Sequence, residues 1–179
     1  GGGFSPADFP LAALAAPVYM TAVMLVLHYN DLLFLRERAR RNWSNIQISL
    51  RKRRNLVRPL NTIVSKYLEH EQELQAALAR MRTEMRTATD DPAAAARYLA
   101  AEQALDGHFR AVVENYPKLK GAKAVAQLTT ALTRLENEVA LMRSGYNDAV
   151  EHYNARIDTF PDLLFARALK FARLDYVAL

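Results

Sequence analysis

Four histidines are the side chains in this chain of the type that most often serves catalysis or binds metals. Their spacing matches no known catalytic or metal site. They are His28, His70, His108 and His152. None follows a glutamate by three residues, the Glu-x-x-His spacing of di-iron helical bundles. His70 precedes Glu71, but no second histidine follows four residues later, as a zinc protease helix requires. The histidines are therefore interpreted as structural or solvated residues.

Other catalytic chemistries also lack a sequence motif. The chain has no glycine-rich phosphate loop. It has no cysteine, which excludes disulfides and thiolate metal sites. Four serines lack the glycine-flanked elbow that presents a nucleophile: Ser44, Ser49, Ser65 and Ser144. We therefore predict that the protein is not an enzyme and that it has no catalytic residue, metal site or cofactor.

A polar pattern of a different kind, Tyr-Asn, occurs three times. Tyr146-Asn147 and Tyr153-Asn154 are seven residues apart, so they repeat on one face of a helix. Tyr29-Asn30 is a third copy, near the start of the helix expected to face them. One interpretation is that the rings pack and the amides satisfy buried polar groups between helices. The other is a shared site for a ligand or a lipid headgroup. We favour the first, because buried amides more often specify helix register.

The element that must position these residues begins as an uncharged apolar run, Phe9 to Leu27. About 20 apolar residues in a helix cross a bilayer, so residues 9–28 are predicted to be a transmembrane anchor. Residues 1–8 are predicted to form an interfacial segment. A signal peptide would carry a basic region before the run, which is missing here. A buried core helix would be apolar along one stripe rather than all round. Pro17 is expected to bend the span.

A strongly basic segment follows the apolar run. The candidates for contacts with lipid headgroups are Arg36, Arg38, Arg40 and Arg41. Nucleic-acid binding would call for exposed aromatic residues among the basic ones, and none is evident, so we predict no nucleic-acid partner. Because Lys and Arg follow the span and do not precede it, the positive-inside rule places the remainder of the chain in the cytoplasm. The expected location is the inner membrane of a bacterial cell, with a single pass.

Helical periodicity dominates the chain after the span. Apolar residues recur every three or four positions between residues 32 and 60. Trp43 lies on this stripe and is expected to be a core anchor, whereas Arg53 interrupts it. Pro59 is expected to perturb the helix, after which a heptad-like pattern runs from Leu60 through Tyr67 to Met85.

Two further helices are predicted by the same rule. One covers residues 92–114, with Asp91 as its cap and Pro92 in its first turn. The other carries the longest regular stripe, from Leu128 through Leu135 to Ile157. Helices with single apolar stripes and short connections bury those stripes most simply in an antiparallel bundle. The predicted fold is therefore all-α: one transmembrane helix that continues into an antiparallel bundle of about four long helices.

The order and spacing of several short motifs resemble the LemA family of bacterial membrane-anchored proteins. No single motif is specific, but together they cover nearly the whole chain from Tyr29 onward. The motifs are Tyr29-Asn30, Trp43-Ser44-Asn45-Ile46 with Leu50-Arg51-Lys52-Arg53, Tyr67 with His70-Glu71, Glu114 to Lys120, Glu136-Asn137, Tyr146 to Val150 with Tyr153-Asn154, Phe160-Pro161, and Phe171 to Tyr176. The sequence departs from the family pattern in three places: Arg58-Pro59 stands where the family has Pro-Asn after the basic run, Lys66 where it has Gly, and Arg173 where it has Pro.

The resemblance implies an N-terminal anchor, a bundle domain over residues 29–179 and no established enzymatic activity. We expect a non-enzymatic interaction or scaffold protein that associates with itself and with membrane lipids. The alternative is an accessory or regulatory subunit of a membrane enzyme such as a metalloprotease, since some genes of the family neighbour such enzymes.

Overall fold

The computed structural model describes residues 8–178, with side chains from Ala13 onward. The expected segment 1–8 therefore lies outside the described residues, except for the backbone of Asp8. The helices are α1 (Asp8–Tyr67), α2 (Gln72–Glu84), α3 (Pro92–Glu114), α4 (Pro117–Lys120), α5 (Lys123–Asp158) and α6 (Asp162–Ala168). No strand occurs within residues 8–178. The predicted all-α architecture is confirmed: a long apolar N-terminal helix continues into a bundle of several helices.

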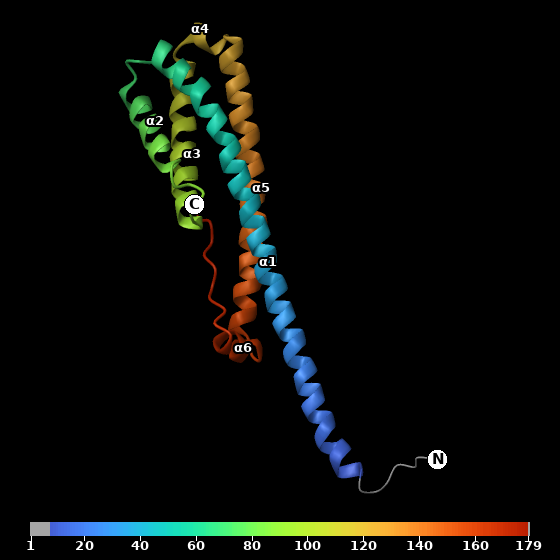
Figure 1. Ribbon diagram of the computed structural model, residues 1–179. Coiled ribbons are helices and arrows are strands. Elements are labelled where there is room, and N and C mark those ends of the chain that lie inside the picture. The colour runs from blue at the N-terminus through green and yellow to red at the C-terminus, as the bar shows by residue number, and fades with distance from the viewer. Residues whose placement is uncertain (1–7, 179) are drawn as a thin grey trace.

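The bundle is built on the two longest helices, as Figure 1 shows. The C-terminal half of α1 packs against α5, while α2 and α3 form a shorter hairpin beside the far end of this pair. The N-terminal part of α1 projects beyond the bundle, and α6 lies at the end of the bundle nearest to it. After α6 and a turn at residues 169–170, the chain runs back along α5 as an extended tail, residues 171–178.

The projecting part of α1 differs from an ordinary core helix. Its most apolar 18-residue window has a mean hydropathy of 1.5, and only 6% of that window is buried in the protein. By length and composition this helix is able to span a membrane. Pro17 lies inside the helix, and the Thr21 hydroxyl donates a hydrogen bond of 2.8 Å to the Pro17 carbonyl.

Pro59, expected to perturb the helix, does not end it, because α1 continues through it to Tyr67. A proline inside a helix costs about 3 kcal/mol, since one backbone donor is lost. Beyond Pro59, however, Leu60, Ile63 and Val64 are all buried in the main core. Burying one aliphatic side chain contributes about 1.5–3 kcal/mol, so three of them outweigh the proline. The heptad-like pattern is instead interrupted after Tyr67, which is 53% exposed.

The predicted start of the third helix is confirmed in detail. The Asp91 side chain accepts a hydrogen bond of 2.7 Å from the Ala94 backbone N–H, and Pro92 occupies the first turn. Trp43 is half-buried and packs against the main core. Arg53, which interrupted the apolar stripe, is 3% exposed and lies inside the bundle.

Candidate functional site

The polar residues of α5 hold the C-terminal tail. The Asn154 side chain donates from Nδ2 to the Leu174 carbonyl and accepts from the Leu174 N–H, both at 2.9 Å. Asn147 binds Val177 in the same two-bond manner, at 3.0 and 2.9 Å. Each amide therefore uses a donor and an acceptor on the backbone of a single tail residue, whatever its side chain.

The spacing of the two asparagines matches the spacing of their targets. Seven residues of α-helix rise roughly 10.5 Å. Three residues of extended chain cover about 10 Å. Asn147 and Asn154 therefore meet Val177 and Leu174 in antiparallel order without distortion of either segment. The seven-residue spacing of the two Tyr-Asn pairs thus sets the register in which an extended peptide binds along α5.

The tyrosines of the two pairs reinforce the same contact. The Tyr146 hydroxyl donates to the Asp175 carbonyl at 2.8 Å, and the Tyr153 hydroxyl donates to the Ala172 carbonyl at 2.9 Å. Burial raises the pKa of Tyr146 to about 12 and also raises the pKa of Tyr153. Both phenols therefore stay protonated at neutral pH and remain hydrogen-bond donors.

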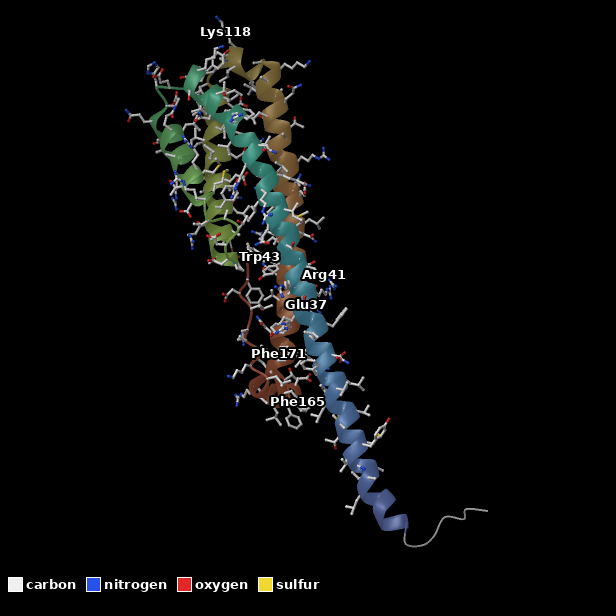
Figure 2. All side chains as sticks on the ribbon, in the orientation of Figure 1. Glu37, Arg41, Trp43, Lys118, Phe165 and Phe171 are labelled. Atoms are coloured by element: carbon white, nitrogen blue, oxygen red, sulfur yellow. The ribbon has the colours of Figure 1, made fainter. Side chains whose placement is uncertain are left out.

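Helix α1 also contacts the tail. Tyr29 meets the ring of Phe171 edge-on, with 6.1 Å between ring centroids. The Arg36 guanidinium lies 5.1 Å from the centroid of the same ring. Phe171 is labelled beside α1 in Figure 2. Further along, Trp43 packs on Tyr146 with centroids 5.7 Å apart. Asn30, the partner of Tyr29 in the third Tyr-Asn pair, is exposed.

The four arginines predicted to contact lipid headgroups are placed differently from one another. Arg36 is half-buried against the tail. Arg38 pairs with Asp148 of α5 at 3.6 Å. Arg40 lies 3.8 Å from Glu37 and is largely exposed, and Arg41 is also exposed.

A second polar feature lies deeper in the bundle, in a cavity of about 140 Å³ between α1, α3 and α5. Arg53 of α1 forms an ion pair with Glu102 of α3, and it donates a hydrogen bond to the Leu135 carbonyl of α5. Burial lowers the pKa of Arg53, as expected for a cation removed from water. The walls of the cavity combine charged side chains with leucine, valine and alanine. This cluster ties three helices together.

Metal binding receives no support from the part of the chain that the structure describes. Within it, no group of three or more His, Asp or Glu side chains is positioned to hold a metal ion.

The tail was the partner that sequence reasoning missed. The Tyr-Asn pairs were expected to meet another helix, whereas in the structure they bind an extended segment 19 to 30 residues later in the chain. Seven helical residues and three extended residues span nearly the same length, and this match could have indicated the contact. Nothing in the local sequence of the tail, however, shows that the tail is extended.

Replacing Asn154, which is 2% exposed, is expected to release the tail. Asn154→Leu removes two hydrogen bonds, each worth about 0.5–1.5 kcal/mol, and leaves the Leu174 backbone groups without partners. The free energy of unfolding in urea should fall by about 1–3 kcal/mol. The matched control is Asn137→Leu, at an exposed position of the same helix, which should change stability little. Equal effects of the two substitutions would contradict the assigned tail contact.

With the geometry established, comparison with known proteins identifies the family. The family model for LemA proteins matches residues 42–179. The chain belongs to the LemA family. The match includes both halves of the tail contact, α5 and residues 171–178, and it begins after the apolar part of α1. The expected resemblance is confirmed.

Three curated relatives of this LemA chain are magnetosome proteins. MamQ 1 and MamQ 2 of Paramagnetospirillum magneticum are each 33% identical to it over 70 residues, which is 39% of this chain. The match covers 26% of the length of each of these two relatives. MamQ of Magnetospirillum gryphiswaldense is 22% identical over 199 aligned positions, covering 97% of this chain and 73% of the relative.

Proposed function

We propose that this LemA protein is a non-enzymatic, membrane-anchored scaffold that forms homo-oligomers through α1. Residues 9–28 are the anchor, membrane lipids surround it, and the bundle stands on the cytoplasmic side of the inner membrane of a bacterial cell. The three magnetosome proteins among its relatives fit a role at a membrane. The continuous helix from the apolar run into the bundle makes the bundle a rigid extension of the anchor.

The observation that carries the self-association is an uncovered apolar stripe along α1. Met20, Leu27, Phe34 and Ile48 are spaced by multiples of seven residues, and their exposed fractions are 65, 59, 61 and 47%. Arg41 occupies the remaining position of this series. A heptad of uncovered apolar side chains is the pattern by which long helices pair.

Within the anchor, small side chains favour close approach of two copies. Four alanines there are exposed: Ala13, Ala15, Ala16 and Ala22. Spans associate in lipid by van der Waals packing, which small residues permit. The contact between two copies of α1 can therefore extend without interruption from the membrane into water.

The mass of the full-length protein, released intact from detergent micelles in a native mass spectrometer, tests the proposal. The wild type should appear at several times the mass of one chain. Phe34→Glu with Ile48→Glu should shift it towards a single chain, because both carboxylates would lie in the contact. Leu141→Glu is the control, since Leu141 is 77% exposed on α5 and outside the stripe. If the wild type has the mass of a single chain in every mild detergent, self-association is refuted. If the particle instead contains a membrane enzyme in stoichiometric amount, the accessory-subunit alternative is favoured.

The cytoplasmic position of the bundle has a separate test. The chain contains no cysteine, so Thr87→Cys provides one thiol in the exposed turn before α3. Neighbouring Ala88 is 3% exposed and unsuitable. The thiol should resist an impermeant maleimide in intact cells and react after permeabilisation. Rapid labelling in intact cells would place the bundle outside and show that the positive-inside rule fails for this chain.

A further inference from the structure

We propose that the base of the bundle, defined as residues 159–170 with α6 at their centre, docks on the bilayer surface as a second membrane contact. This inference rests on the proposed function, because it requires the apolar part of α1 to cross the bilayer. Its partner is the interfacial layer of a membrane that contains anionic lipids.

The depth of the base is fixed by its contacts with α1. His28 directly follows the apolar run. Its Nδ1 lies 2.5 Å from Oδ1 of Asp162, the first residue of α6, and its ring stacks on Phe165 with 5.7 Å between centroids. Figure 2 shows Phe165 at the base of the bundle, beside α1 where the helix leaves it. The base therefore lies at the level where α1 would emerge from lipid.

The attachment is firm because Asp162 is buried. Its side chain is 3% exposed and also forms an ion pair with Arg156 of α5, so the start of α6 is tied to both long helices. Ala166, one turn later, packs in a small core with Leu32 and Tyr153. The base is consequently tied to α1, and the anchor keeps it close to the membrane surface.

The chemistry of the base suits the lipid interface. Phe160, Leu164 and Leu169 are 75, 57 and 52% exposed, a concentration of large apolar groups in one short segment. The exposed charged residues of residues 159–170 are Arg167 and Lys170, both cations, while the single acid of the segment is the buried Asp162. Apolar side chains flanked by cations are the composition of segments that insert shallowly and bind anionic lipids.

Distance along α1 favours the base over the arginines predicted from sequence. The headgroup layer extends only about 5–8 Å beyond the hydrocarbon on each side. At about 1.5 Å per residue, Arg36 stands roughly 12 Å past His28, and Arg41 roughly 20 Å past it. These arginines reach lipid only through a field that decays over about 8 Å at physiological salt. The residues of the base, rather than these arginines, are therefore the ones placed to contact the headgroups.

Single-cysteine labelling of the full chain tests the docking, since the native sequence has no cysteine. Leu164→Cys, Leu25→Cys and Leu141→Cys would each carry the fluorophore NBD, in vesicles of phosphatidylcholine and phosphatidylglycerol with nitroxide lipids. A label at 164 should be quenched most by nitroxides at shallow depth, and a label at 25 most by deep ones. A label at 141, an exposed leucine of α5, should stay unquenched. Leu169→Cys repeats the measurement at a second exposed position.

The outcomes separate this inference from the proposed function. If the label at 25 is quenched while those at 164 and 169 behave like the label at 141, the anchor stands and the docking is refuted. If the label at 25 is also unquenched, the anchor itself fails. As a further readout, Arg167→Gln and Lys170→Gln should each lower the ratio of docked to undocked base by about fivefold on anionic vesicles. No change from either substitution would refute the anionic-lipid component.

Discussion

Val139→Asp should abolish cooperative unfolding of the bundle. Val139 is 3% exposed and belongs to the main core. An unpaired carboxylate buried there costs several kcal/mol, whether it stays charged or takes up a proton. That cost is comparable with the whole stability of a domain, about 5–15 kcal/mol. Thermal unfolding of the full-length protein in detergent, followed by circular dichroism at 222 nm, should lose its sigmoidal transition.

The same helix supplies the control for this prediction. Leu141 lies two residues away and is 77% exposed, so Leu141→Asp should leave the melting temperature nearly unchanged. Leu135 was expected on the buried stripe but is only half-buried, so Leu135→Asp should have an intermediate effect. If Val139→Asp and Leu141→Asp melt alike, the assigned phase of α5 is wrong.

Removing Arg53 should be the most damaging single change among the charged residues. Its partner Glu102 has a side chain only 14% exposed, so Arg53→Met would leave a carboxylate buried without a counter-ion. Breaking a buried pair in this way costs about 3–5 kcal/mol. The free energy of unfolding in urea measures the loss. Arg97→Met is the control, because the Arg97–Glu84 pair has an arginine 57% exposed and is worth at most about 1 kcal/mol.

The paired substitution distinguishes an ion pair from simple packing. Arg53→Met with Glu102→Leu removes both charges and leaves apolar side chains of similar volume. Such replacements are often neutral or stabilising, so most of the loss should be recovered. A double variant as unstable as the sum of its two single variants would contradict the coupling of Arg53 with Glu102.

The sequence by itself was enough to predict the features that depend on local geometry. The apolar run predicted a helix able to span a membrane, because length and hydropathy are properties of a single segment. Asp91 and Pro92 marked the start of α3, because capping involves residues three apart in the chain. The stripes predicted an all-α bundle and most of the buried positions of α5, because helical periodicity places side chains on faces without reference to a partner.

Tertiary structure decided the points at which packing overrides a local signal. Pro59 carried a local signal against a continuous helix, yet the helix continues because Leu60, Ile63 and Val64 are buried beyond it. Arg53 interrupted an apolar stripe, and its burial became intelligible only with Glu102, 49 residues away. In both cases the deciding energy comes from contacts that a local pattern does not contain.

The partners of the polar side chains were likewise beyond the reach of the sequence. The spacing of Asn147 and Asn154 placed them on one face of a helix, but the tail that they bind is an irregular segment without periodicity. The contact between His28 and Asp162 joins residues 134 positions apart. Helix formation depends on neighbours within one turn. The partner of a side chain depends on how distant parts of the chain pack together. Here the packing of α5 against α1 brings Asp162 to His28, and the segment after α6 runs back along α5 to meet the two asparagines.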